Sequence, residues 1–318
     1  MSTLDDIYEE INIADSIVIL THEHPDGDAV GTALALYNAL KIRDKNVEVV
    51  IPEYSRCFSN VPGIKDVLKE GSKEEYSLAI TVDTASLNQL GDCIKYFENA
   101  KKTICIDHHS SNNMMGDLNF VDPFSPAAAQ VLYGIFKAYN WEITEDIGTD
   151  IMTGIVTDTG GFQYEQVSKE TFEIAAEMRA MGINIPQIYK DTLSTHTIAS
   201  FKLKVLANDR LEILEDGKVT FTYIDMKDEE KVNAEVGDYE GIVNEGRDLE
   251  GVEVSIFLHQ IDKGYKASLR SNSYVNVSEI CGKFGGGGHV RAAGATFTEG
   301  TPKQIKEILV NEIKKYLK

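Results

Sequence analysis

Aspartate and histidine residues directly follow hydrophobic runs in the first third of this chain. SIVIL (16–20) is followed by His22, Asp26 and Asp28, LAITV (78–82) by Asp83, and KTICI (102–106) by Asp107, His108 and His109. So many ionisable groups are costly to bury without partners. Carboxylates and imidazoles without thiolates favour Mn²⁺ or Mg²⁺, with Fe²⁺, Co²⁺ or Zn²⁺ as alternatives. The residues therefore predict a site for divalent metal ions.

The number of these groups exceeds what one ion needs. Asp158 closes a later apolar stretch and precedes a glycine pair that gives the backbone room to turn. Because one carboxylate can bridge two cations, we expect two ions close enough to share a nucleophilic hydroxide. A purely structural interpretation makes Asp28 a helix cap and Asp83 a turn residue, but it leaves His22 and Asp26 unexplained.

Parallel β-strands are the elements that would position these groups. Continuous apolar runs separated by helical patterns predict a parallel sheet with helices on both faces. Further strands are expected at 47–51 and near 118–121, and helices over 29–42, 127–139, 145–157 and 169–181. Ligands of such sheets bind at the carboxyl ends of the strands. The fold would therefore gather the acidic and imidazole groups at one edge.

The second part of the chain has a different pattern. A more polar helical stretch leads to two predicted hairpins, RLEIL with KVTFTYI and VEVSIFLHQI with YKASLRS, and then to helices near 278–284 and 302–318. We expect an α/β metal-binding domain over 1–186, a helical linker over 187–209 and a smaller α+β domain over 210–318.

Four consecutive glycines, Gly285 to Gly288, precede His289 in this second part. Glycines let backbone N–H groups converge on an anion, or let a ligand approach the main chain, and packing by itself does not account for the run. A tight interdomain turn is the alternative. Arg270, Ser271 and Asn272 end a predicted strand, and the Arg270 guanidinium could pair with a surface glutamate or bind a phosphate.

Composition limits the partners and the location. The formal charge of −20 over 318 residues argues against binding long nucleic acid, although a small phosphorylated ligand remains compatible. No apolar stretch is long enough to span a bilayer, and MSTLDDIYEE lacks the features of a signal peptide. The four cysteines are scattered without a CxxC pair, which favours reduced thiols and a cytoplasmic protein.

Five motifs carry a resemblance to a known family. HEHPDGDAVG, ITVDTAS, IDHHSS and GIVTDTGGF, in this order, resemble the four motifs of the DHH phosphoesterase superfamily. GGGGHVRAAG resembles the signature of the associated C-terminal domain in its nano-RNase and RecJ-type exonuclease branches. The motifs run from about residue 22 to 294, nearly the whole chain. One departure is the segment 125–128, SPAA, which is less polar than the Ser/Thr-rich segment expected there.

The resemblance implies a role for each matched residue. One ion would be held by His22, Asp26 and Asp83, and the other by Asp28, Asp83, His108 and Asp158, with Asp83 bridging. The catalytic residues would be Asp83, His109, which faces the scissile phosphate as a hydrogen-bond donor or acid, and Asp107, which orients the imidazoles. The nucleotide would be bound by Arg270, Ser271, Asn272, Gly286, Gly287, Gly288 and His289.

The resemblance also implies an activity. We expect hydrolysis of short RNA or DNA oligonucleotides and removal of the 3′-phosphate of pAp, with Mn²⁺ as the first choice of metal and Mg²⁺ or Co²⁺ as alternatives. A phosphodiesterase of pApA or of cyclic dinucleotides is the alternative enzyme, and a non-catalytic nucleotide sensor is a third reading. A metallo-β-lactamase pattern is rejected because Gly27 replaces its final histidine. Edge strands could support a homodimer.

Overall fold

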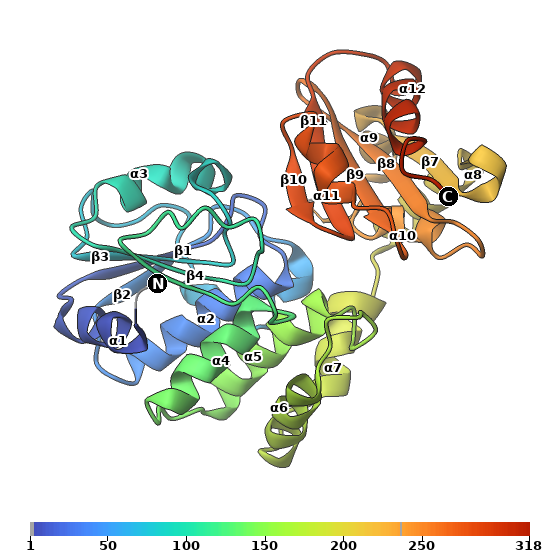
Figure 1. Ribbon diagram of the computed structural model, residues 1–318. Coiled ribbons are helices and arrows are strands. Elements are labelled where there is room, and N and C mark those ends of the chain that lie inside the picture. Colours follow the sequence, from blue (N-terminus) through green and yellow to red (C-terminus); the bar gives the residue numbers. More distant parts are fainter. Residues whose placement is uncertain (1–2, 236) are drawn as a thin grey trace. The chain divides into compact units, whose positions relative to one another are not determined.

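The computed structural model describes residues 3–235 and 237–318. The chain forms two compact units, one ending at Thr195 and the other beginning at His196 (Figure 1). The segment predicted as a linker, 187–209, spans this division. Helix α7 (Ile185–Tyr189) and the π-helical turn η4 (Lys190–Ser194) belong to the first unit, and α8 (Ile198–Asp209) belongs to the second.

A five-stranded parallel sheet forms the centre of the first unit, as the apolar runs predicted. The strands follow the order β2-β1-β3-β4-β5. Their bounds are β1 (Ile17–Leu20), β2 (Val47–Val50), β3 (Leu78–Val82), β4 (Thr103–Asp107) and β5 (Leu118–Val121). Every residue of β1 and β3 is buried, which explains why these strands are apolar throughout.

Helices cover both faces of this sheet. They are α1 (Leu4–Ile13), α2 (Gly27–Lys41), α3 (Ile94–Glu98), α4 (Ala128–Ala138) and α5 (Glu145–Asp158), with 3₁₀ turns η1 (Arg56–Phe58), η2 (Ile64–Asp66) and η3 (Leu87–Cys93). A further helix, α6 (Lys169–Ala180), packs on α5 and not on the sheet (Figure 1). Ile17 and Ile19 pack into the core between the sheet and helices α2, α4 and α5, whereas Val18 and Leu20 pack into the smaller core between the sheet and α3 (Figure 1). The alternation follows from the two-residue period of a strand.

The second unit contains a six-stranded mixed sheet in the order β10-β11-β9-β8-β7-β6. The strands are β6 (Glu212–Leu214), β7 (Val219–Ile224), β8 (Val254–Ile261), β9 (Gly264–Ser271), β10 (Gly287–His289) and β11 (Ala292–Phe297). The two predicted hairpins are confirmed as the antiparallel pairs β6–β7 and β8–β9. Strands β10 and β11 were not predicted, because their glycines and alanines lack the β-branched residues typical of strands.

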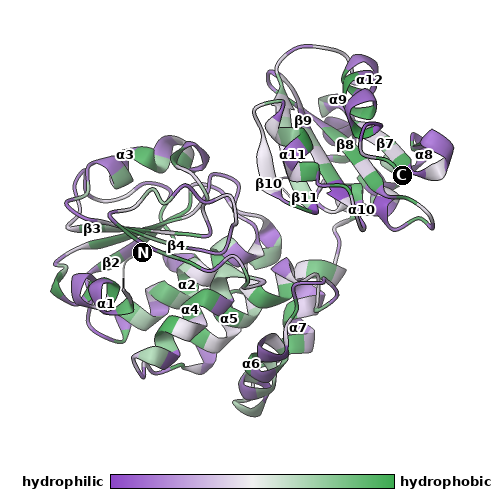
Figure 2. Cartoon of the chain, in the orientation of Figure 1, coloured by the Kyte–Doolittle hydropathy of each residue, from purple (hydrophilic) through white to green (hydrophobic). Residues whose placement is uncertain are grey.

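Short helices complete the second unit. They are α9 (Met226–Val232), α10 (Ile242–Arg247), α11 (Val277–Gly282) and α12 (Pro302–Ile313), with the 3₁₀ turn η5 (Glu215–Gly217). Ile305, Leu309 and Ile313 of α12 lie one helical turn apart and are buried in the core of this unit. Figure 2 shows the resulting pattern, with hydrophobic strands inside and hydrophilic residues on the outer sides of the helices. Among the described helices, none combines the length and the apolar character needed to cross a membrane.

Candidate metal centre

Three neighbouring strands end at the same edge of the first sheet. Strand β3 lies between β1 and β4, so the residues that follow these strands meet. His22 Nε2 lies 3.8 Å from Asp83 Oδ2, and His108 Nε2 lies 3.4 Å from Asp83 Oδ1. The two oxygens of the Asp83 carboxylate therefore face imidazoles from two different strand ends.

The nitrogen and oxygen atoms at this edge fall into overlapping groups that could hold an ion. Within each group, one donor atom per residue lies within 4.8 Å of the others. The groups are His22, Asp26 and Asp83; Asp28, His108 and Asp158; and Asp83, Asp107, His108 and His109. The structure thus brings together all eight of the N-terminal site residues singled out in the sequence, from four separate segments between residues 22 and 158.

Asp83 is unusual in both its backbone and its side chain. It has a left-handed φ of 49°, and its side chain is buried. Among the described residues, Asp83 Oδ1 has no hydrogen-bond partner. A buried carboxylate oxygen without a donor is energetically unfavourable, and a divalent cation would compensate it.

Close packing of α2 on α5 brings Asp28 to the site. A Cβ atom on Gly31 would lie 2.5 Å from the Asp150 carbonyl oxygen, and one on Gly154 would lie 2.5 Å from Asp28 Oδ1. Gly27 is in equally close contact with the Thr157 side chain. Glycine at these three positions therefore permits the approach. Gly31 and Gly154 were not predicted from the sequence to matter for the site. The spacing of four between Gly27 and Gly31, which places both on one face of a helix, could have indicated a close helix contact.

The Asp28 carboxylate is held by main-chain groups of α4. It accepts hydrogen bonds from the backbone N–H groups of Ala128 at 2.5 Å and Ala129 at 3.0 Å, and from the Thr32 hydroxyl at 3.1 Å. The segment 125–128, which lacks the expected polar side chains, contributes here through its backbone. Capping of α2 falls to Asp26, whose Oδ1 accepts from Asp28 N and Ala29 N, and not to Asp28 as the structural alternative assumed.

His108 is oriented by a hydrogen bond on the far side of its ring. Its Nδ1 lies 3.1 Å from the Ser125 carbonyl oxygen, so Nδ1 carries the proton donated to that oxygen. Nε2 then faces three carboxylates, Asp83 and Asp158 at 3.4 Å and Asp28 at 3.7 Å. This is the arrangement expected of a histidine that ligates a metal through Nε2.

His109 is held by the buried carboxylate of Asp107, which is itself held by Asn112. Its Nδ1 lies 2.7 Å from Asp107 Oδ1, and the Asn112 amide donates to Asp107 Oδ2 at 2.6 Å. Asp107 also accepts from the backbone N–H of His108. Asn112 was missed in the sequence, where a single asparagine after IDHHSS carries no distinctive signal.

Burial and crowding of charge shift the pKa values of these groups. Burial raises the pKa of Asp28 well above its ordinary range and that of Asp158 to about 7, with the other carboxylates adding to the effect. Burial opposes the charge on His109, yet the contact with Asp107 and the charge of Asp83 raise its pKa to about 9. For Asp83, burial is outweighed by the imidazoles of His108, His109 and His22, and its pKa is lowered.

The donor set fits divalent cations. Negative charge at this edge is balanced by protonated imidazoles, and ions of charge +2 are the other way to balance it. Carboxylate and imidazole donors without thiolates suit Mn²⁺ and Mg²⁺. The residues thus match the class of metal expected from the sequence.

In the second unit, Arg270 and His289 lie in one row across three strands. Ala292 of β11 pairs with Arg270 of β9 on one side and with His289 of β10 on the other, so the two side chains share a face of the sheet. Ser271 and Asn272 are engaged within their own unit. The Ser271 hydroxyl donates to the Val275 carbonyl, and the Asn272 amide donates to the carbonyls of Arg247 and Val252.

The run of glycines from Gly285 to Gly288 has a packing role that was not predicted from the sequence. A Cβ on Gly286 would lie 2.0 Å from the Gly294 carbonyl oxygen, and one on Gly288 would lie 2.5 Å from that of Ala292. Close approach of β10 to β11 therefore requires these two glycines. Beyond their chain neighbours, Gly285 and Gly287 have no atom of the described residues within 4 Å of the equivalent position, so this packing does not explain them.

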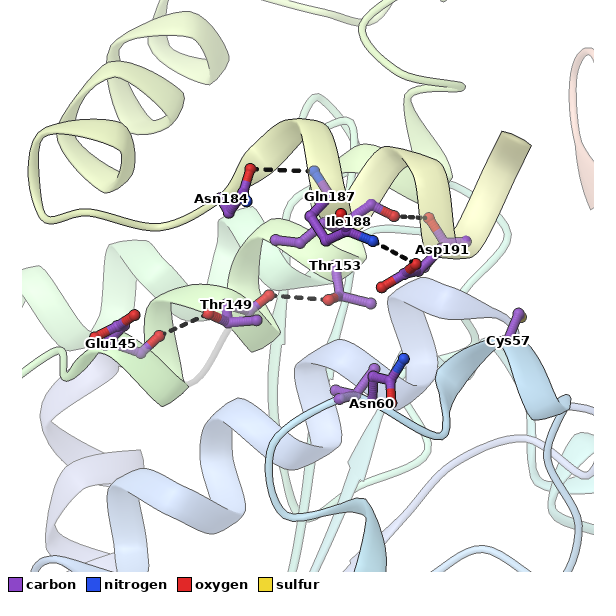
Figure 3. Close-up of a pocket in the computed structure, with 11 residues that line it drawn as sticks. Cys57, Asn60, Glu145, Thr149, Thr153, Asn184, Gln187, Ile188 and Asp191 are labelled. Carbon is purple, nitrogen blue, oxygen red and sulfur yellow. Dashed lines mark hydrogen bonds between the residues drawn. The ribbon is translucent and has the colours of Figure 1, made fainter. Parts of the chain in front are cut away.

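A separate cavity of about 420 Å³ lies in the first unit beside the N-terminal half of α5 (Figure 3). Thr149 and Thr153 of α5 face Gln187 and Ile188 of α7 across it, and Asn60 lies on the third side. None of the site residues described above lines this cavity.

Comparison with known proteins identifies the two units. The pattern of the DHH family, N-terminal domain, matches residues 16–156, and that of the DHHA1 domain matches residues 216–318. The bifunctional oligoribonuclease and PAP phosphatase NrnA of Thermus thermophilus is 31% identical over 283 residues, which cover 88% of this chain and 83% of the relative.

Two further proteins resemble nearly the whole chain. The cyclic-di-AMP phosphodiesterase PdeA of Listeria monocytogenes is 26% identical over 98% of this chain and 49% of its own length. A crystal structure of an exopolyphosphatase-related protein from Bacteroides fragilis superposes with a TM-score of 0.89 at 26% identity, covering 98% of this chain and 96% of that one.

Proposed function

The chain belongs to the DHH family of phosphoesterases and carries a DHHA1 domain, and we propose that it hydrolyses short oligonucleotides to mononucleotides and removes the 3′-phosphate of pAp. The NrnA relative named for these two activities covers both units, and both sets of motifs are present here. A small phosphorylated nucleotide is the substrate class that links the two reactions.

We assign the ligands of two ions from the groups described above. One ion would be held by His22, Asp26 and Asp83, and the other by Asp28, Asp83, His108 and Asp158. The observation that carries this assignment is that one oxygen of Asp83 faces His22 and the other faces His108. Mn²⁺ is the proposed metal, with Mg²⁺ or Co²⁺ as alternatives.

Bound divalent ions supply Lewis-acid stabilisation of phosphoryl oxygens and make water a better nucleophile at neutral pH. The residues of the chain position the reacting groups. His108 keeps its Nδ1 proton on the Ser125 carbonyl and turns Nε2 toward the carboxylates. His109 is proposed to donate a hydrogen bond or proton from Nε2 to a phosphate oxygen, since its Nδ1 is engaged by Asp107.

The second unit is proposed to bind the rest of the nucleotide. Arg270 can bind a phosphate through two N–H groups, and His289 shares its face of the sheet. Gly287 leaves open space beside the main chain where a ligand can approach, and Gly286 and Gly288 hold its strand close to β11. Ser271 and Asn272 contribute by fixing the turn that follows β9.

Steady-state kinetics with Mn²⁺ would test the proposed activity. The panel contains di- to pentanucleotides, pAp, pApA, cyclic dinucleotides, inorganic pyrophosphate and polyphosphate, ranked by kcat/KM. Dinucleotides to pentanucleotides and pAp are expected to rank first. Fastest hydrolysis of pyrophosphate or polyphosphate would contradict the proposal, and polyphosphate belongs in the panel because of the exopolyphosphatase-related structure.

A phosphodiesterase of pApA or cyclic dinucleotides is the second candidate. It is favoured by the similarity to PdeA over 98% of this chain, although the chain spans about half of that protein. A preference for cyclic di-AMP over dinucleotides in the same panel would select this function. Rapid turnover of any of these substrates would exclude a non-catalytic sensor.

The charge and the cysteines of the chain bear on its partners and its location. With a formal charge of −20, the surface is expected to repel long duplexes, and a duplex should not compete with a dinucleotide at physiological salt. Free thiols at all four cysteines fit a cytoplasmic location. A homodimer would be detected as a doubled mass in light scattering.

A further inference from the structure

The turn that follows Asp158 has three consecutive residues with left-handed backbone. Gly160, Gly161 and Phe162 have φ values of 58°, 72° and 67°. Two glycines adopt this conformation easily, but phenylalanine rarely does. Strained backbone of this kind persists only where the surroundings impose it, and it is concentrated at functional sites.

Local contacts impose the conformation of this turn. The Thr159 hydroxyl donates to the Ile155 carbonyl at 2.6 Å and accepts the Phe162 N–H at 3.0 Å. The Phe162 ring stacks on Phe172 of α6, with centroids 5.6 Å apart and an angle of 21° between the rings. The turn is therefore attached to α5 on one side and to α6 on the other.

Tyrosine rings cover the two glycines. A Cβ on Gly160 would lie 2.6 Å from Cζ of Tyr164, and a Cβ on Gly161 would lie 2.5 Å from Cε2 of Tyr189. Each ring thus lies directly on the backbone of a glycine, where only glycine leaves room for it. The Tyr189 ring comes from a different element, α7.

Helix α7 is itself held in place. Ile188 is buried in the core of the first unit. The Asn184 side chain caps the helix at Gln187 N, and the Gln187 amide donates to Asp191 at 2.7 Å (Figure 3). The neighbouring Tyr189 ring is therefore presented to the turn from an anchored helix.

Asp158 differs from the other carboxylates in how it is held. Asp28, Asp26 and Asp107 each accept hydrogen bonds from two or more donors. Asp158 contacts His108 at 3.4 Å, and in the part of the chain that the structure describes no hydrogen bond fixes its carboxylate. Its direction is therefore set by the backbone of the last turn of α5 and of the turn that follows it.

We propose that Tyr189 is a positioning residue, whose ring packs on Gly161 and holds the turn so that Asp158 faces His108 and Asp28. The inference deepens the proposed function, since it rests on Asp158 as a metal ligand. The hydroxyl has no part in this contact, which is made by ring carbons. Phenylalanine should therefore replace tyrosine, whereas alanine should not.

Calorimetric titration of the full-length, metal-free protein with Mn²⁺ tests the proposal. Tyr189→Ala should weaken binding at one of two sites by about 10- to 100-fold, the range for outer partners of metal ligands, and Tyr189→Phe should bind as the wild type does. Tyr139→Ala is the matched control, because it removes a tyrosine ring stacked on Tyr8 at the far end of α4. In an Asp158→Asn background the effect of Tyr189→Ala should disappear.

Binding of both ions by Tyr189→Ala with wild-type affinity would overturn the inference. If that variant fails to fold, Tyr189→Leu keeps the apolar volume without a flat ring and should show the same weakening. The readout is independent of substrate. A dependence of Mn²⁺ affinity on Tyr189 in a protein that hydrolyses no nucleotide would retain the positioning role and reject the proposed function.

Discussion

At the scale of single residues, Asp83 combines an unusual backbone conformation with an unusual side-chain environment. A left-handed backbone occurs in the same residue as a buried carboxylate oxygen that has no hydrogen bond from any described residue. Aspartate and asparagine tolerate this backbone better than most residues. The side chain can therefore be neutralised without changing the preferred conformation, which makes the position a direct test of the proposed ion bridge.

We expect Asp83→Asn to lower kcat with Mn²⁺ by at least about 100-fold, since even outer partners of metal ligands contribute 10- to 100-fold. The metal-free variant should unfold at a somewhat lower temperature, because the lowered pKa of Asp83 shows that its charge, paired with the imidazoles of His108 and His109, stabilises the folded state. Asp117→Asn is the control, because Asp117 binds Thr103 at the opposite end of β4. Normal turnover in Asp83→Asn would eliminate a bridging role.

Gly287 offers a test in the second unit. A Cβ at this position meets no atom within 4 Å, so Gly287→Ala should leave the unfolding temperature unchanged. If substrate approaches the main chain there, KM should rise about tenfold, equivalent to about 1.4 kcal/mol. Gly282→Ala has the same open surroundings at the end of α11 and should keep the wild-type KM. Equal KM values in both variants would remove Gly287 from the proposed binding surface.

At the scale of elements, the contact between α2 and α5 determines where Asp28 and Asp158 lie. Asp28 is in the first turn of α2 and Asp158 is the last residue of α5. The glycines at positions 27, 31 and 154 let the two helices approach until side chains of one contact the backbone of the other. The site therefore depends on small residues that carry no chemistry themselves.

Replacing a glycine in this contact should affect both stability and activity. Gly154→Ala would place a methyl group against Asp28 Oδ1 and Ala129, and should lower the free energy of unfolding by about 1–3 kcal/mol, together with kcat. Gly134→Ala on α4 meets nothing within 4 Å and should raise the free energy of unfolding by about 0.5–1 kcal/mol. Denaturant unfolding compares the two, and equal effects would argue against close packing at Gly154.

Asp150 on α5 should make stability depend on pH. Burial raises its pKa well above the ordinary value, an effect that the hydrogen bond from Asn38 on α2 opposes. The folded state thus favours the protonated form of Asp150. The protonated carboxyl makes its full contribution to stability below the unfolded pKa of 3.8, and this contribution is lost as pH rises toward the pKa of the folded state. Within that interval, each rise of one pH unit lowers the free energy of unfolding by up to about 1.4 kcal/mol.

Asp150→Asn should remove this dependence, because asparagine keeps an acceptor for Asn38 and cannot ionise. Its stability relative to the wild type should increase from pH 4 to pH 7, as measured by urea unfolding at each pH. Glu145→Gln, at an exposed position in the first turn of α5, controls for a general effect of charge, because Glu145 is not among the groups that shift the pKa of Asp150. Parallel stability curves for Asp150→Asn and the wild type would contradict the assignment.

At the scale of the whole molecule, the proposed metal-binding and nucleotide-binding residues lie in two different units. The ligands proposed above for the two ions all lie in the first unit, whereas Arg270 and His289 lie in the second. Each unit has its own core, so each can unfold as a separate transition. Metal binding should then stabilise only one of them.

Calorimetric melting of the intact chain should show this difference. Mn²⁺ at 100 times its Kd is expected to stabilise the first unit by about 2.7 kcal/mol, and EDTA should reverse the shift. The midpoint temperature of the second unit's transition should change by no more than about a degree. Variants that lie in that unit alone, such as Gly282→Ala, identify which transition belongs to it. A shift of both transitions by the same amount would place metal binding elsewhere or show that the units unfold together.

Much of this organisation was predictable because local patterns encode it. The apolar runs before His22, Asp83 and Asp107 predicted the parallel sheet, and its strand order then brings their ends together. The hairpins β6–β7 and β8–β9 were also predicted, since both have alternating patterns and turn residues between them. The β10–β11 pair was not, because its register depends on contacts between backbones rather than on side-chain periodicity.

The amino-acid order by itself determined which donors are available and which strand each one follows, because strand and helix periodicities are properties of short segments. Tertiary structure decided how the donors are held. The backbone of Ala128 and Ala129 supports Asp28 across 100 residues, and Tyr189 covers Gly161 from another helix. Such contacts join segments that are distant in the chain, and their geometry exists only once the helices have packed.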